Sequence, residues 1–524
     1  MPGASTEDQT EVIECLAAPS THGGAAVERI DTHSAIVFLA GERAWKLKRA
    51  IRFDYLDFST IERRKALCED EVRLNRRTAP SVYRGVVAVT REPDGSLVLG
   101  GSGTPVDWVV EMSRFTQEAL FDRLAVSGQL DMGLMPPLGA AIARFHRAAE
   151  HRPDRGGKAG MAWVIEGNAA GFAEYGGDAL DPAACTRVTE AARAEVGRHG
   201  ALLDARRDAG YVRQCHGDLH LRNIVLLDGQ PALFDAVEFN DEIACIDVLY
   251  DLAFLLTDLW SRRLPRHANA VWNGYLAESP DLGGVSLLPL FLSCRAAVRA
   301  KTSATAARFQ NVSERAMELR ELARDYLALA ESLLHPPAPC VIAIGGLSGS
   351  GKSTLALRLA PSVGAVPGAV VVRSDEIRKS LCGVPPLERL GPEGYTPELS
   401  RRVYATAVER AAAMVRTGHS AIVDAVFARP QDRAAIEAAA ASASVPFVGV
   451  WLDTAEALLI ERSQRRRCDP SDADADVIRA QLAEGTGVIG WHRIDASPGP
   501  EAVLRQAILH ARRRLGLRAG TAAE

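Results

Sequence analysis

Residues 340–354, CVIAIGGLSGSGKST, carry the most specific motif of the chain. Within them, GLSGSGKS matches the pattern G-x-x-x-x-G-K-[ST], with an apolar strand-like run before it and a helical pattern after it. Glycines let backbone N–H groups curl around a phosphate, and the following helix adds its positive N-terminal end. In such a loop Lys352 reaches the β- and γ-phosphates and Ser353 binds Mg²⁺. We expect ATP to be held by Gly346, Ser348, Gly349, Ser350, Gly351, Lys352, Ser353 and Thr354.

Around this loop, strand-like runs alternate with helical patterns. The runs are CVIAIGG, AVVVRS, SAIVDAV and FVGVWLD, an order typical of a parallel sheet with helices on both faces. Asp375 and Asp424 come at strand ends, on the sheet edge where such folds bind ligands. We expect Asp375 to accept the proton of an acceptor hydroxyl and Asp424 to be a metal ligand. Arg378, on the next helix, is expected to hold an anionic substrate or the transferring group.

An arginine-rich segment, ERSQRRRCDPSDAD, occupies residues 461–474. Phosphoryl transfer benefits from arginines that close over developing negative charge. Arg462 and Arg466 share a helical face at i, i+4 spacing, so we expect both to contact the nucleotide. A solvated helix face is the alternative for this run.

A second constellation lies upstream, in HGDLHLRN at residues 216–223. Phosphoryl transfer to a hydroxyl needs a carboxylate to accept the proton, and an amide and another carboxylate to hold Mg²⁺. We expect Asp218 to be this base, with His216 bracing the loop. Asn223 and the later Asp235 are the expected metal ligands.

A lysine and a glutamate for the same site come from the strand AWKLKRA and the helix after it. A kinase-like site needs one lysine on the α- and β-phosphates and a helix glutamate to orient it. Lys46 and Lys48 share one strand face, since strand side chains alternate. We select Lys46 with Glu71, and leave Lys48 open as the alternative.

With these residues, positions 25–335 resemble the aminoglycoside phosphotransferase and choline kinase branch of the protein-kinase-like fold. The resemblance is carried by His216, Asp218, Asn223 and Asp235. It implies that WVVEM is a hinge strand whose backbone holds adenine, at Glu111 and Met112. No G-x-G-x-x-G precedes the lysine strand, so the resemblance implies a short nucleotide loop in which Ser34 takes this place.

Residues 340–524 resemble small P-loop kinases of the polynucleotide kinase, zeta toxin and gluconate kinase type. The motifs that carry this likeness are GLSGSGKST, SDEIR, VDAVF and the arginine-rich segment, and WHRIDAS is similar to the last strand of those kinases. The resemblance implies that Asp375 is the base and Arg378 the acceptor-site arginine.

The proline-rich stretch HPPAPC, residues 335–340, marks the expected joint, because its prolines cannot continue the preceding helix. We therefore expect a mixed α/β and α+β protein of two domains, a bilobal kinase-like domain and a P-loop domain with a parallel sheet. The expected segments are a flexible N-terminus (1–24), a small lobe (about 25–115), a helical lobe (about 116–335), a linker (336–339) and the P-loop domain (340–524).

Composition supports this division. The 524 residues exceed the roughly 250–300 at which one core stops growing, so more than one domain is expected. The net charge of −5 disfavours nucleic acid as a partner, and nine cysteines without a C-x-x-C pair indicate reduced thiols. The polar start MPGASTEDQTEVIE lacks the features of a secretory signal. We expect a cytoplasmic protein that acts on small molecules and not on membranes.

The function predicted from these residues is a pair of fused phosphotransferases that use ATP and Mg²⁺. Their acceptors are small hydroxylated molecules, with sugars or aminocyclitols favoured. One alternative is that one domain only senses nucleotide and regulates the other, as a pseudokinase does. Another is that the P-loop domain phosphorylates a nucleotide or a nucleic-acid end.

Overall fold

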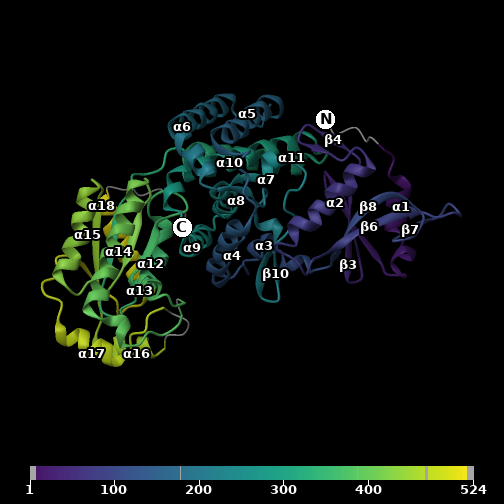
Figure 1. The fold of residues 1–524 in the computed structure, drawn as a ribbon. Coiled ribbons are helices and arrows are strands. Elements are labelled where there is room, and N and C mark those ends of the chain that lie inside the picture. Colours follow the sequence, from purple (N-terminus) through teal and green to yellow (C-terminus); the bar gives the residue numbers. More distant parts are fainter. Residues whose placement is uncertain (1–6, 178, 386, 466–469, 516–524) are drawn as a thin grey trace. The chain divides into compact units, whose positions relative to one another are not determined.

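The structure, a computed structural model, describes residues 7–177, 179–385, 387–465 and 470–515. Internal contacts group them into two compact units (Figure 1). The first unit contains the residues up to Leu134, Ala141–Gly167 and Arg193–Asp258, and the second contains Met135–Ala140, Asn168–Ala192 and the residues from Leu259 onward. The helices that follow Asp258 thus group with the C-terminal sheet. The predicted joint at residues 336–339 stays a prediction.

A six-stranded antiparallel sheet begins the first unit, in the order β1-β2-β3-β8-β6-β7. Its side chains alternate between two covered faces. Ile36 and Phe38 pack in the cluster that contains helix α1, whereas Leu39 and Val110 pack in the cluster that contains helix α2. The strands are β1 (Val27–Asp31), β2 (Ala35–Ala40), β3 (Arg43–Lys48), β6 (Tyr83–Arg91), β7 (Leu97–Leu99) and β8 (Thr104–Ser113), and the second helix is α2 (Ile61–Asn75).

Helix α1 (Thr10–Ala17) lies within the segment expected to be flexible, residues 1–24. Val12 and Leu16 are one helical turn apart, and both are buried beside the sheet. The acidic and polar composition of the segment hid this apolar pair, so the structure differs here from the expectation.

Helices and short hairpins form the rest of the kinase-like part. The predicted loop 216–223 lies between strands β9 and β10, and helix α8 follows it in the sequence. The elements are β4 (Arg52–Phe53), β5 (Leu56–Asp57), α3 (Phe121–Val126), α4 (Met135–Ala148), α5 (Gly157–Tyr175), α6 (Pro182–Asp208), β9 (Val212–Gln214), β10 (Ile224–Leu227), β11 (Gln230–Leu233), α7 (Asp241–Ala244), β12 (Cys245–Asp247), α8 (Val248–Ser261), α9 (Pro265–Glu278), α10 (Leu288–Arg308) and α11 (Ser313–Leu333).

A five-stranded parallel sheet forms the core of the second unit, in the order β14-β15-β13-β16-β17, which confirms the predicted parallel sheet. Every residue of β13 is buried, as expected for a strand covered on both faces. Helices α12 and α18 pack with Ile342 and Ile344 on one face. The elements are β13 (Val341–Gly345), α12 (Lys352–Leu359), β14 (Val370–Arg373), α13 (Ser374–Cys382), α14 (Pro397–Arg416), β15 (Ala421–Asp424), α15 (Pro430–Ser442), β16 (Phe447–Asp453), α16 (Glu456–Gln464), α17 (Ala475–Glu484), β17 (His492–Asp495) and α18 (Pro500–Leu515).

Strand β14 is an edge of this sheet, and helix α9 covers it within the second unit. Asn269 Nδ2 donates to the carbonyl of Ala369 at 3.0 Å, and Asn273 Oδ1 accepts from the N–H of Val371 at 2.7 Å. These side chains satisfy backbone groups that an open edge would leave to another strand.

One helical segment, Leu282–Arg308, is long and apolar enough to cross a membrane by length and composition. In the structure 67% of its most apolar window is buried, and the core helix of a soluble protein passes the same test. Its apolar character is accounted for by packing inside the second unit.

His419 lies buried in the loop before β15, and we expect it to make the folded protein less stable at acid pH. Burial lowers the pKa of His419 to about 4, although its ring contacts the Gly368 carbonyl at 2.8 Å. The folded state therefore favours the neutral ring, whereas the unfolded chain binds a proton below about pH 6.5. Stability is lost as the pH falls from 6.5 towards 4. Between pH 7 and pH 5 we expect this residue to cost about 2 kcal/mol.

Urea unfolding at both pH values measures the effect. His419→Gln removes the titrating group, so the variant should lose less stability on acidification than the wild type. Equal losses in both proteins would contradict the assignment.

Candidate active sites

Lys46 of β3 lies between two carboxylates of the first predicted site. Its Nζ donates to Glu71 Oε1 at 2.8 Å and also contacts Asp235 Oδ1. Burial by itself lowers the pKa of Lys46, but Asp235 and Glu71 raise it well above its ordinary value. The ammonium thus stays charged, and its side chain keeps 15% exposure. Three residues predicted from distant parts of the sequence meet at this point.

Lys48, the alternative lysine, has a different environment. Its side chain is 1% exposed, and Nζ contacts both Glu71 Oε2 and Glu238 Oε1. Phe58 lies under the ammonium, with the ring centroid 5.0 Å away. Lys48 is therefore enclosed by protein groups, whereas Lys46 is the lysine that reaches Asp235.

Asp218 and Asn223 are brought together in the loop after β9. Asn223 Nδ2 donates to the backbone oxygen of Asp218 at 2.9 Å and to its Oδ2 at 3.1 Å. The Asp218 side chain is 41% exposed, and His220 Nε2 lies 3.3 Å from its Oδ2. A carboxylate held in this way can receive a proton from a bound hydroxyl.

His216 makes two hydrogen bonds around this loop. The Asp218 N–H donates to His216 Nδ1 at 3.3 Å, and His216 Nε2 contacts the Phe234 carbonyl at 2.9 Å. Because Phe234 directly precedes Asp235, the histidine links the segments of the predicted base and the predicted metal ligand. Burial lowers the pKa of His216, so the ring is neutral.

Asp251 of α8 is a positioning residue whose role the sequence did not reveal. Its oxygens accept the N–H groups of His216 at 3.1 Å and Gly217 at 2.8 Å, and His146 Nε2 lies 3.0 Å from Oδ2. Asp258, two turns later, accepts the Leu221 N–H at 3.0 Å. Sequence reasoning gave neither residue a role in the site. They anchor the loop backbone from a buried helix.

Asp235 adopts an unusual backbone conformation, with φ of +62°. Its N–H donates to the Tyr83 hydroxyl at 3.0 Å, and its side chain is 42% exposed. Positive φ in a residue other than glycine occurs often at functional sites, where the surroundings maintain it. The strain is consistent with a carboxylate aimed for ligand binding.

Ser34 lies in the turn between β1 and β2, where its backbone oxygen accepts the Arg49 N–H at 2.9 Å. Its neighbour His33, which sequence reasoning passed over, is electrostatically coupled to the site. Burial lowers the pKa of His33, while Asp218 and Asp235 oppose the shift. The polar sequence DTHSA was the available signal that this turn faces the carboxylates.

Glu111 and Met112 lie in β8, beside the lysine strand β3. Met112 pairs with Ala44 and is 9% exposed. The Glu111 side chain contacts Arg43 and lies 3.8 Å from Arg84 Nε. At these residues β8 pairs with β3 on one side and with β6 on the other, so an adenine held by their backbone stays a prediction.

The glycine-rich loop adopts the conformation that its sequence demands. Gly351, with φ of +97°, precedes helix α12, and Lys352 Nζ donates to the Leu347 carbonyl at 3.0 Å. A Cβ at Gly349 would lie 2.5 Å from the Leu459 carbonyl, so only glycine fits beside α16. Ser350 is 1% exposed, and its Oγ has no hydrogen-bond partner among the described residues.

The other residues predicted for this loop lie in the loop itself or at the start of α12. Gly346 has φ of +142°, and a Cβ there would meet Ser350 Oγ at 2.7 Å. Ser353 and Thr354 lie in the first turn of α12, half-buried and exposed respectively. The Ser348 N–H donates to Gln481 Oε1 at 3.0 Å, a contact from α17 that sequence reasoning missed.

Asp375 and Asp424 lie close together at the carboxyl edge of the parallel sheet. Burial raises the pKa of Asp375, and the negative charge of Asp424 adds to the effect. Lys352 and Arg373 oppose this shift. Arg373 Nε is 3.5 Å from Asp424 Oδ2, an ion pair that sequence reasoning did not anticipate. The predicted base and metal ligand thus share one electrostatic environment with the phosphate-loop lysine.

Arg378 is 8% exposed and points towards the segment before α14. Its NH1 donates to the Gly394 carbonyl at 2.8 Å and to Ser400 Oγ at 3.2 Å, and the Tyr395 ring centroid is 4.8 Å from Cζ. In this structure the guanidinium holds the segment before α14 to α13, and its role in acceptor binding stays a prediction.

Arg462 contacts the phosphate loop and the residue that follows β17. Its NH1 donates to the Ser350 carbonyl at 3.4 Å, and its NH2 donates to the Ala496 carbonyl at 2.8 Å. Arg466, predicted on the same helical face, lies outside the described residues.

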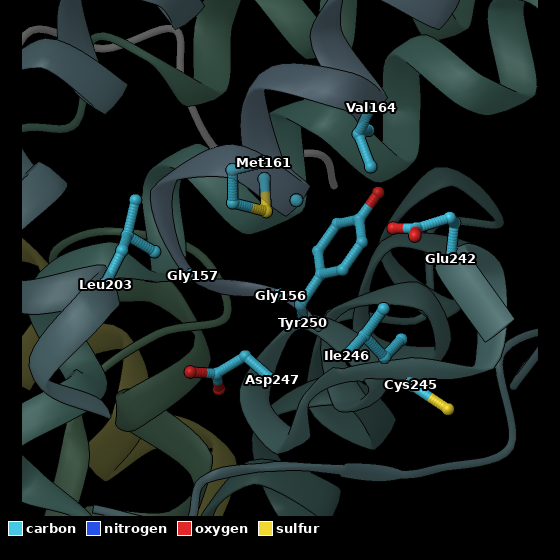
Figure 2. Close-up of a pocket in the computed structure, with 11 residues that line it drawn as sticks. Gly156, Gly157, Met161, Val164, Leu203, Glu242, Cys245, Ile246, Asp247 and Tyr250 are labelled. Atoms are coloured by element: carbon cyan, nitrogen blue, oxygen red, sulfur yellow. The ribbon is translucent and has the colours of Figure 1, made fainter. Parts of the chain in front are cut away.

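One cavity lies away from the predicted sites, and another lies beside the phosphate loop. Figure 2 shows a cavity of about 20 Å³ in the first unit, whose lining includes Gly156, Met161, Asp247 and Tyr250; it has room for roughly one water molecule. None of the predicted site residues lines it. The other, of about 230 Å³, lies beside the phosphate loop and includes Leu347 in its lining.

Two family models match the chain in the predicted order. The phosphotransferase enzyme family matches residues 119–288, and an AAA domain family matches residues 341–487.

Curated relatives match almost the whole chain. Rv2004c of Mycobacterium tuberculosis, described as an uncharacterized protein, is 30% identical over 484 residues, which is 91% of this chain and 94% of the relative. Mb2027c of Mycobacterium bovis matches with the same figures.

Two solved structures illustrate the likeness of each part. A gluconokinase from Sinorhizobium meliloti is 21% identical and covers 34% of this chain and 97% of its own, with a TM-score of 0.26. A choline/ethanolamine kinase family protein from Mesorhizobium loti is 13% identical and covers 62% of this chain and 99% of its own, with a TM-score of 0.37.

The order of the two family matches confirms the resemblances drawn from the motifs, and kinase-type domains make this protein a kinase. The chain belongs to the same family as Rv2004c, and in this chain a phosphotransferase-type domain is followed by a P-loop domain.

Proposed function

We propose that the chain is a bifunctional phosphotransferase in which each domain transfers the γ-phosphate of ATP to a hydroxyl of a small molecule. Sugars and aminocyclitols are the favoured acceptors. The observation that carries the proposal is the occurrence of two separate charge clusters. In one cluster Lys46 contacts Asp235, and the charges of Lys46, Asp218 and Asp235 all act on His33. In the other, the charge of Lys352 acts on Asp375.

In each centre the acceptor oxygen attacks the γ-phosphorus as the bond to the β-phosphate oxygen breaks and ADP leaves. The hydroxyl proton passes to Asp218 in the first centre and to Asp375 in the second. Lys46, held by Glu71, neutralises phosphate charge in the first centre. Lys352 does so in the second, supported by backbone N–H groups at the start of α12.

Both centres offer oxygen ligands of the kind that Mg²⁺ prefers. Asn223 and Asp235 would hold the ion in the first centre, and Ser353 and Asp424 in the second. Bound there, it would neutralise the negative charge of the phosphates. The partly exposed Asp235 carboxylate and the Asn223 amide fit such a group.

Separate removal of the two bases tests the proposal. Asp218→Asn and Asp375→Asn should each abolish one ATP-dependent phosphorylation and spare the other. General-base catalysis contributes about 10²- to 10⁴-fold, so losses of that size are expected. The assay follows the transfer of labelled γ-phosphate to a library of hydroxylated metabolites.

Matched controls are Asp228→Asn in the exposed β10–β11 turn and Asp476→Asn on α17, whose side chain is 90% exposed. Catalysis at these centres is refuted if both base variants phosphorylate every acceptor at the wild-type rate.

Nucleotide stoichiometry provides an independent prediction. Calorimetry with a non-hydrolysable ATP analogue and Mg²⁺ should find two sites in each chain. Lys352→Ala removes the cation of one site, so it should leave a single occupied site. A single site in the wild type that persists in Lys352→Ala would argue against two nucleotide centres.

The two lysines of β3 should respond differently to substitution. Lys46→Met should weaken ATP use by the first centre, because it removes the ammonium beside Asp235 that neutralises phosphate charge in the proposed reaction. Lys48→Met should instead destabilise the protein by about 3–5 kcal/mol, because Glu71 and Glu238 lose a buried counter-charge. Steady-state kinetics and thermal unfolding separate the two effects. The assignment reverses if Lys48→Met folds normally and loses ATP affinity.

A further inference from the structure

Asp472, in the segment between α16 and α17, occupies a ready-made anion site in the second unit. Lys379 Nζ donates to its two carboxylate oxygens at 2.8 and 2.6 Å. The Tyr395 hydroxyl donates at 2.8 Å and the Leu390 N–H at 3.0 Å. An ammonium, a phenol and a backbone amide from separate parts of the acceptor side thus converge on one carboxylate.

This anion site lies beside the proposed base. Asp375 and Lys379 are four residues apart in α13, so they lie on one helical face, with Cβ atoms about 5–6 Å apart. Ser471, adjacent to Asp472, donates a side-chain hydrogen bond to Asp375. Two consecutive residues therefore place a hydroxyl on the base and a carboxylate on the lysine.

We propose that Ser471 and Asp472 occupy the places of an acceptor that carries both a hydroxyl and an anionic group. The anionic group is a carboxylate or a phosphate and binds Lys379, Tyr395 and the Leu390 N–H. This inference rests on the proposed function of the P-loop domain and names its substrate class. In the reaction, the acceptor hydroxyl takes the place of the Ser471 hydroxyl and gives its proton to Asp375 as the phosphorus–oxygen bond forms.

Burial of the lysine favours a charged acceptor over a neutral one. The Lys379 side chain is 2% exposed, and a buried ammonium is costly unless a counter-charge is present. An acceptor that displaces Asp472 must supply that charge itself. A neutral sugar would leave Lys379 with the neutral Glu388 carbonyl but without a counter-charge, whereas a sugar acid or sugar phosphate would replace the lost carboxylate.

The test uses the full chain with Asp218→Asn, so that only the P-loop centre turns over. Acceptors are compared in matched sets of neutral polyol, carboxylate and phosphate, such as xylitol, xylonate and xylitol 5-phosphate. A hydrogen bond to a charged group is worth about ten- to a hundredfold in affinity, so the anionic members should exceed the polyol in kcat/KM by this factor. A comparison of kcat/KM for the carboxylate and the phosphate acceptor identifies which anion the site prefers.

Two variants probe the site. Lys379→Met should bring the ratio of anionic to neutral kcat/KM close to one. Asp472→Asn should lower KM for the anionic acceptor, because the internal competitor loses its charge. Arg402→Met, exposed on α14, is the control and should leave the ratio unchanged.

Several outcomes overturn the inference. It is wrong if the polyol is preferred, if Lys379→Met lowers turnover of all three acceptors equally, or if Asp472→Asn leaves the KM of the anionic acceptor unchanged. The acceptor ratio and Asp472→Asn decide the question even if Lys379→Met fails to fold. Calorimetric binding of the same compounds separates this result from the proposed function. Lys379-dependent anion binding without phosphorylation would refute the function and retain the site.

Discussion

Asp251 has no exposed surface, yet it receives two backbone N–H groups of the loop that carries Asp218. A buried carboxylate is tolerated only when donors surround it, so these hydrogen bonds both pay for the charge and fix the loop. His146, 3.0 Å away, completes the arrangement from another helix. The position of the candidate base therefore depends on an interaction in the helical core beneath the loop.

The same constraint operates at the other charged centres. Glu71 is fully buried because Lys46 and Lys48 both contact it, and their positive charges lower the pKa of Glu71 against the opposing effect of burial. In the second unit, Lys379 and Asp472 satisfy each other. Each centre thus uses paired charges to hold groups that a ligand can later engage. This pairing makes the clusters sensitive to the loss of one partner.

Backbone geometry contributes what charge pairing cannot. The approach of α16 to Gly349 leaves no room for a side chain, and Gly351 carries a positive φ just before α12. These glycines allow N–H groups and a helix N-terminus to face one point. Asp235 reaches a comparable conformation without being glycine, which requires support from its surroundings such as the Tyr83 hydroxyl.

Sequence alone determined the parallel sheet, the phosphate loop and the HGDLHLRN loop, because each depends on spacing within a short segment. The polar composition of residues 1–24 led us to expect a flexible segment, but α1 forms there and buries Val12 and Leu16. Only the tertiary structure distinguished Lys46 from Lys48, since the contact with Asp235 spans 189 residues. It also revealed Asp251 beneath the loop and Asp472 against Lys379, 93 residues away. Periodicity encodes which face a residue occupies, but the partner across a core is set by how distant elements pack.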